Sequence, residues 1–142
     1  MAEKKFTKKY EYSGSMDEEI IELCDALNAL PGIETFDSCC GHGACALMIF
    51  FRSTSEEGLF FLTRCVDRRY WKYGYLWGID LSVGDLWKEE KPRPTTYRLH
   101  SGPIVGEDAY EQAKYLVRNM NRHLNNEAFM NAFKLDITKF DL

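Results

Sequence analysis

Five consecutive apolar residues, Leu47–Phe51, constrain the fold more than any other segment of the chain. A run this apolar is typical of a strand buried on both faces, so it predicts a strand at the centre of a sheet. A short strand is predicted before it at Ile33–Asp37, and two more are predicted after it at Tyr73–Val83 and Thr95–His100. The sequence therefore predicts a sheet of about four strands.

Helical periodicity predicts three longer helices around these strands. The predicted helices are about Met16–Leu30, a segment that starts within Ser53–Glu57 and runs to about Arg69, and a long one that opens at Glu107 and breaks at Asn125-Asn126. Ser15 and Glu18 have the spacing of a capping box at the first helix. The order helix, strand, strand, helix, strand, strand, helix predicts an α+β fold, with helices packed on one face of a mostly antiparallel sheet.

The remaining segments are predicted to connect or flank these elements. Residues 1–14 are basic and polar and are predicted to form a short edge strand or a loose tail. Gly84–Pro94 is predicted to be a loop and Gly102–Gly106 a connector, and Ala128–Phe133 is predicted to be a short helix. With 142 residues, the chain fits a single domain over residues 1–142.

Composition limits the function classes that this chain can serve. The formal net charge of −4 argues against general nucleic-acid binding, although a local basic patch remains compatible with it. The N-terminal residues contain no apolar segment of the kind found in signal peptides, and no run is long enough to span a membrane. Five cysteines without a spread-out framework favour reduced thiols and a cytoplasmic protein.

The segment Asp37–Cys45 gathers three cysteines, a histidine, a serine and two glycines in nine residues. One interpretation is a zinc site, because Cys39, His42 and Cys45 have ligand-like spacing and thiolate with imidazole suits zinc. A fourth ligand would come from His100 or His123. A second CxxC or HxxxH pair, which would make this interpretation strong, is not found in the sequence.

A second interpretation is a reactive thiol, in which Cys39 is the nucleophile and His42 lowers its pKa. A disulfide between Cys39 and Cys40 would be strained, because adjacent Cα atoms lie about 3.8 Å apart and disulfides usually need roughly 4.4–6.8 Å. A third interpretation is a ligand-binding loop, with Gly41 and Gly43 shaping a nest of backbone N–H groups. A purely structural turn with inward-packed cysteines is a fourth.

Other residues extend these interpretations. Arg98 and His100 share strand parity and would line a pocket if their side of the sheet carries the glycine loop. Cations at 64–72 alternate with aromatic residues at 70–77, a pattern that fits RNA binding but fits helix ends and core packing better. The acidic residues at 17–22 are expected to be a solvated first turn without chemistry.

The run from Asp25 to Gly43 resembles a group of small uncharacterised bacterial and phage proteins that share a helix, a strand and a Ser-Cys-x-Gly-His loop. It is more distantly similar to the wybutosine-synthesising tRNA methyltransferase small family, which has a Ser-Cys-x-Gly motif after the same helix and strand. This resemblance covers about Asp17–Phe51 and implies that Ser38, Cys39 and Gly41 lie in a pocket for S-adenosylmethionine or a tRNA base. His42 stands where that family usually has an arginine.

Together, these features predict a ligand-binding or catalytic pocket at the Ser38–Gly43 loop. Cys39 and His42 are the expected catalytic residues, and Ser38, Gly41, Gly43, Arg98 and His100 are the expected binding residues. A small molecule or nucleotide is the expected ligand, with nucleotide or RNA modification as the expected activity and S-adenosylmethionine or zinc as cofactor. The alternatives are a zinc-binding protein and a non-enzymatic homodimeric module, in which residues 126–142 pack on a partner through Phe129, Met130 and Phe133.

Overall fold

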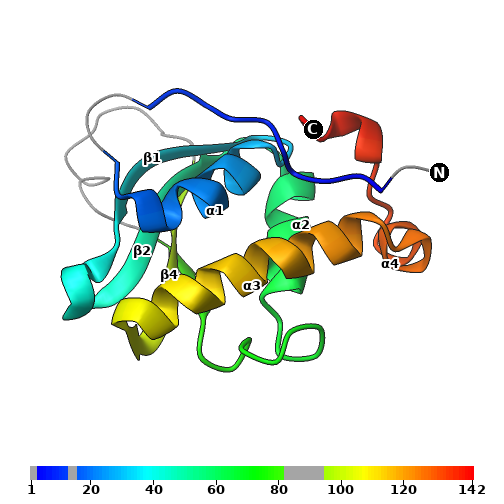
Figure 1. The fold of residues 1–142 in the computed structure, drawn as a ribbon. Helices are drawn as coiled ribbons and strands as arrows, with labels where there is room; N and C mark the ends of the chain where they lie inside the picture. The colour runs from blue at the N-terminus through cyan, green and yellow to red at the C-terminus, as the bar shows by residue number, and fades with distance from the viewer. Residues whose placement is uncertain (1–2, 13–15, 82–94) are drawn as a thin grey trace.

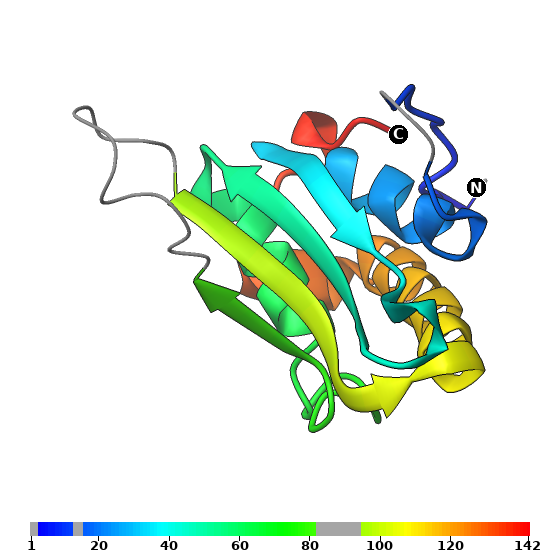
Figure 2. The ribbon, with the colours of Figure 1, turned by 90° about the vertical axis from the view of Figure 1, so that its left-hand side faces the viewer.

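The computed structural model describes residues 3–12, 16–81 and 95–142. Strand β2 (Ala46–Ser53) is an inner strand that pairs antiparallel with β1 (Ile33–Cys39) and with β4 (Thr95–Val105). Strand β3 (Gly78–Leu81) pairs antiparallel with β4, which gives the order β1-β2-β4-β3 (Figure 2). The predicted central strand and antiparallel sheet are confirmed.

Helices cover one face of this sheet (Figures 1 and 2). They are α1 (Glu18–Asn28), α2 (Glu56–Cys65) and α3 (Gly106–Leu124), followed by the short helix α4 (Glu127–Ala132) and the 3-10 turn η3 (Ile137–Lys139). Another 3-10 turn, η1 (Gly41–Gly43), lies between β1 and β2. Along β2, Leu47, Ile49 and Phe51 are fully buried, while the intervening residues are half-buried. Since alternate strand residues point to opposite faces, this alternation marks the helix-covered face and the open face of the sheet.

The helices follow the predicted periodicity with shifted ends. In α1, Ile20, Leu23, Cys24 and Leu27 are buried as predicted. The helix starts at Glu18 instead of Met16, its N-cap position is Asp17, and the Ser15 of the expected capping box lies outside the described residues. At α2 the Ser55 hydroxyl accepts a hydrogen bond from the Glu57 N–H, as a serine cap should.

Three further predicted boundaries are wrong. The helix predicted to run to about Arg69 ends at Cys65. The predicted strand at Tyr73–Val83 begins only at Gly78, and residues 66–77 fold into consecutive turns held by backbone hydrogen bonds. Trp71 and Trp77 are buried from these turns, and the Trp77 indole donates to the Gln112 side chain on α3 at 2.9 Å. The predicted connector at Gly102–Gly106 is instead largely the end of β4, which runs to Val105. The predicted loop at Gly84–Pro94 lies outside the described residues.

Both ends of the chain lie against its own helices. Residues 3–12 form no strand, and their backbone is held by side chains of α3 and α1, with the Phe6 N–H donating to Asn121 at 2.8 Å. Near the C-terminus, Phe140 packs edge-on against Phe61 with ring centroids 5.1 Å apart. Phe129 and Met130 are buried in the core of the same chain. The homodimer expected from these residues stays a prediction.

His123 on α3 generates a pH prediction. Its ring is buried and stacks on Phe129 with centroids 4.2 Å apart, and burial lowers the pKa of its imidazole despite a backbone contact from Tyr70. The unfolded chain therefore binds more protons below about pH 6.5, so stability is full above that pH and falls as the pH drops toward the lower folded-state pKa.

We expect urea unfolding monitored by circular dichroism to show a lower free energy of unfolding at pH 5.5 than at pH 7.5. His123→Phe keeps the ring stack and should lose less over the same interval. His42 and His100 are present in both proteins, so their contributions cancel. An equal loss in both proteins would contradict the assignment to His123.

Candidate metal centre

The loop after β1 has an unusual backbone. Three successive residues have positive φ angles, with Gly41 at +79°, His42 at +49° and Gly43 at +79°. The amides of Ala44 and Cys45 both donate to the Gly41 carbonyl, at 2.9 and 3.0 Å, which closes the turn. Gly41 also approaches the next strand closely, because a Cβ there would lie 3.0 Å from the Ala46 carbonyl oxygen. The two glycines thus hold His42, a residue with a Cβ, in a left-handed conformation that such residues rarely adopt.

A β-bulge in β1 decides which side chains of the motif face the helices. The register with β2 shifts between Thr35 and Asp37, so Ser38 lies opposite the buried Ile49 and Cys39 lies opposite Met48. Met48 in turn lies opposite His100 on β4, which places Cys39 on the open face of the sheet. Cys40 follows the strand and is 4% exposed.

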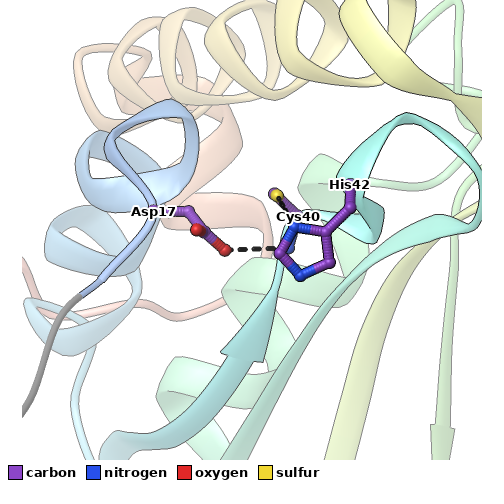
Figure 3. Close-up of side chains that lie close together, drawn as sticks. All are labelled: Asp17, Cys40 and His42. Atoms are coloured by element: carbon purple, nitrogen blue, oxygen red, sulfur yellow. Dashed lines mark hydrogen bonds between the residues drawn. The ribbon is translucent and has the colours of Figure 1, made fainter.

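Three side chains from two separate segments converge at the end of β1 (Figure 3). The Cys40 sulfur lies 3.7 Å from His42 Nδ1, and the Asp17 carboxylate accepts a hydrogen bond from the Cys40 N–H at 3.3 Å. One potential ligand atom from each of these residues lies within 4.8 Å of the other two. Among residues 3–12, 16–81 and 95–142, no other set of three His, Cys, Asp or Glu side chains has its ligand atoms this close together.

Asp17 reaches this group because it does not cap its own helix. It occupies the N-cap position of α1, and its side chain makes no capping hydrogen bond there. Aspartate at an N-cap usually accepts from the N2 or N3 amide. Here the carboxylate turns to the Cys40 amide instead, while the helix N-terminus still favours its negative charge.

Tyr110 on α3 is a neighbour of the thiol. Its hydroxyl interacts with the Cys40 side chain and with the backbone of Gly43. The contact with Cys40 is the main cause that raises the pKa of Tyr110 to about 12, followed by desolvation. The phenol is therefore protonated at neutral pH and ties the long helix to the loop.

A cleft of about 370 Å³ adjoins the group. The start of α1, strand β1 and residues 11–12 line it, and Asp17 and Ser38 both belong to its wall. Its other carboxylates are Glu11, Glu34 and Asp37. A cleft with four carboxylates repels phosphate esters and favours neutral or cationic ligands.

The predicted site residues are distributed over three places. His42 joins the group of three, Gly41 and Gly43 shape its loop, and Ser38 lines the cleft. Arg98 and His100 lie on the open face, where Asp80 Oδ2 is 2.6 Å from the Arg98 guanidinium and 3.0 Å from His100 Nε2. Cys45 is exposed.

The predicted zinc ligands Cys39, His42 and Cys45 do not form a group of this kind, because their ligand atoms do not all lie within 4.8 Å of one another. His123, one of the two histidines expected to supply a fourth ligand, is buried against Phe129.

Sequence reasoning missed three residues of the site. The acidic pattern at 17–22 predicts a solvated turn for Asp17, and no motif in the sequence marks Tyr110 or Cys40. The adjacent cysteines were the available signal, since one of two neighbours at a strand end must face inward.

Comparison with known protein families, curated proteins and solved structures found no match for this chain. The structure itself therefore carries the functional argument. In the part of the chain that the structure describes, none of the helices has the length and apolar character needed to cross a bilayer.

The backbone at His42 predicts a stability difference between two variants. Left-handed backbone costs a residue with a Cβ about 1–2 kcal/mol and costs glycine almost nothing. We expect His42→Gly to be more stable than His42→Ala by about 1 kcal/mol in metal-free urea unfolding, because glycine's greater freedom in the unfolded chain offsets part of the gain. An alanine variant as stable as the glycine variant would show that residue 42 is not left-handed.

Proposed function

We propose that the protein binds a divalent transition metal, zinc in the first place, through Asp17, Cys40 and His42. The observation that carries the proposal is the convergence of a thiol, an imidazole and a carboxylate from α1 and the β1–β2 loop. Thiolate, imidazole and carboxylate are the three protein ligand types of zinc.

The spacing of the group supports this assignment. Tetrahedral bonds of about 2.0–2.3 Å to zinc place neighbouring ligand atoms roughly 3.3–3.8 Å apart. The separation of 3.7 Å between the Cys40 sulfur and His42 Nδ1 matches that value. The limit of 4.8 Å for the other pairs leaves a contraction of about 1.5 Å at most, which rotation of the half-buried Asp17 side chain can supply. The strained backbone at His42 supports a functional role as well, because strain of this kind clusters at active sites and ligand clamps.

Three protein ligands leave one tetrahedral position for water or a ligand, which is the pattern of catalytic zinc sites. Zinc in such a site lowers the pKa of its bound water to about 7 and polarises carbonyl groups. Asp17 connects the group to the cleft, where Ser38 offers a hydroxyl to a bound molecule. We therefore propose that the cleft takes a neutral or cationic small molecule, and that the loop positions it beside the metal.

A reactive thiol is the second candidate function, favoured by the same contact of 3.7 Å between Cys40 and the imidazole of His42. This pair has the residue types of a cysteine nucleophile and its base. The low exposure of Cys40, at 4%, counts against it, since an attacking sulfur must be reached by its substrate. Cys39, the expected nucleophile, has its sulfur near the Gly41 amide, at 3.4 Å.

The metal proposal predicts a specific set of affected variants. We expect about one zinc per chain, measured by competition with a chromophoric chelator. Substitutions Asp17→Asn, Cys40→Ser and His42→Gly should each weaken binding by more than about 100-fold, because substitutions of outer partners alone already cost 10–100-fold. Tyr110→Phe removes only the hydroxyl next to the sulfur and should cost about tenfold.

Cys39→Ser and Cys45→Ser are matched controls, because they remove neighbouring thiols from the same loop. Both should keep zinc, and Co²⁺ bound to them should keep its thiolate absorption, which Cys40→Ser should lose. Loss of metal in the two controls with retention in Cys40→Ser would instead support the ligands expected from sequence. No binding in any of these proteins would overturn the metal proposal.

Alkylation of the thiols separates the two candidate functions. Burial raises the pKa of Cys24 to about 12 and that of Cys65 well above its usual range, so neither should react in the folded protein. Cys45 is exposed and should react first with iodoacetamide, followed by the half-buried Cys39 and then slowly by the buried Cys40. Zinc should protect Cys40 and leave Cys45 unaffected, as read by mass spectrometry of peptides. Faster labelling of Cys40 than of Cys45, slowed by His42→Gly, would favour the nucleophile instead.

A further inference from the structure

A second pocket lies between the turns after α2 and the outer side of α3. Its volume is about 330 Å³, within the range of small-ligand sites. It shares no residue with the candidate metal group or with the carboxylate-lined cleft. The lining residues are Trp71, Lys72, Tyr73, Tyr115, Arg118, Asn119 and Arg122.

Two tyrosines form the aromatic part of this pocket. The rings of Tyr73 and Tyr115 are nearly parallel, with an interplanar angle of 5° and centroids 5.8 Å apart, and both side chains are half-buried. Trp71 packs edge-on against Tyr73 at 5.5 Å and is itself buried. The Tyr115 hydroxyl donates to the Glu111 carboxylate at 2.7 Å. Fixed, parallel and partly open rings of this kind form a platform on which another planar ring can stack.

Three cations surround these rings. The Lys72 ammonium lies 5.0 Å from the Tyr73 ring centre, and the Arg118 guanidinium lies 5.4 Å from that of Tyr115. Arg122 is oriented by hydrogen bonds to the Asn119 side chain and to the Tyr70 carbonyl. Among the described residues, none of these three cations is within ion-pair distance of a carboxylate, whereas Arg52, Arg69, Arg98 and Lys139 each are.

Among the described residues, no carboxylate lines the pocket. Glu111 accepts the hydrogen bond of Tyr115 and lines a neighbouring groove with Tyr115 and Arg118. A site that combines stacked rings with unpaired cations is suited to a ligand that joins a planar ring to an anion. We propose that this pocket binds a nucleotide, with the base on the platform of Tyr73 and Tyr115 and the phosphate near Lys72 and Arg118. The volume accommodates a single nucleotide, either free or as one unit of a single strand.

The structure divides the cations and aromatic residues at 64–77 into those that pack within the fold and those that line the pocket. Arg64 stacks on Phe60 and Phe133, and Arg69 pairs with Asp67, so both are occupied within the fold. Lys72 and Tyr73 remain at the pocket, where α3 supplies the matching ring and guanidinium. The site is thus made of two half-sites that are about 40 residues apart in the sequence.

Ligand binding to the pocket can be measured by tryptophan fluorescence, because Trp71 lies in the pocket wall. We expect adenosine monophosphate to quench the intrinsic tryptophan fluorescence of the full chain in a saturable way, and more weakly at high salt. The double variant with Lys72→Gln and Arg118→Gln should bind at least about tenfold more weakly, since a charge-assisted hydrogen bond contributes roughly 1.5–3 kcal/mol. Tyr115→Leu should weaken binding by a similar factor through the lost stacking. Arg52→Gln, on the open face of the sheet, is the matched control and should bind as the wild type does.

Unphosphorylated adenosine should bind at least about tenfold more weakly than the monophosphate if the cations hold the phosphate. A short single-stranded adenylate oligonucleotide tests the source of the nucleotide. Tighter binding of the oligonucleotide would assign the pocket to a nucleic-acid strand, and binding of the monophosphate alone would assign it to a free nucleotide. Absence of saturable quenching up to about 10 mM of either ligand, or an equal loss in Arg52→Gln, would overturn the proposal.

Discussion

The burial of β2 between two strands and beneath the helices is the constraint on which the rest of the structure depends. Leu47, Ile49 and Phe51 are fully buried, so the helices must lie on their side of the sheet. The Leu47 amide donates to the buried Ser101 hydroxyl at 3.0 Å, which fixes the start of β2 against β4. The loop that enters β2 is therefore held at one end of the sheet, beside the start of α1 and the side of α3 that carries Tyr110. The candidate metal group forms at that meeting point because three elements are anchored around one strand.

The single bulge in β1 explains why the sequence indicated the right loop but not the right cysteine. In a regular strand beginning with the buried Ile33, Cys39 would share its face and point toward the helices. The register shift between Thr35 and Asp37 reverses this alternation, so Ser38 faces inward and Cys39 faces outward. Cys40 then turns under α3, where Tyr110 contacts it. A bulge leaves no clear pattern in these residues, so strand parity counted from the sequence alone could not separate the two cysteines.

Local patterns predicted the fold better than they predicted long-range contacts. The periodicity of α1 and α3 and the apolar run of β2 report burial directly, and the structure confirms them. Tyr73–Trp77 misled because aromatic residues favour strands, while here Trp77 is buried from turns closed by hydrogen bonds and Tyr75 is exposed. Asp17 lies 23 residues before Cys40 in sequence, and only the packing of α1 against the sheet brings the two together. Contacts of that kind depend on tertiary structure, which local propensity does not encode.

Helix α3 supports both proposed sites and also keeps them apart. Tyr110 contacts the candidate metal group, whereas Tyr115 and Arg118 line the second pocket. A rise of 1.5 Å per residue puts Arg118 about 12 Å further along the helix axis than Tyr110, or slightly more than two turns. The groove along these positions is lined by five glutamates and two cations, so its lining is negative overall: Glu18, Glu19, Glu22, Glu107, Glu111, Lys114 and Arg118. Negative charge along that groove favours a cation near the metal group and opposes movement of a phosphate toward it. Side chains of α1 and α3 thus place most of this negative charge on the side of the candidate metal group, and the two proposals do not depend on each other.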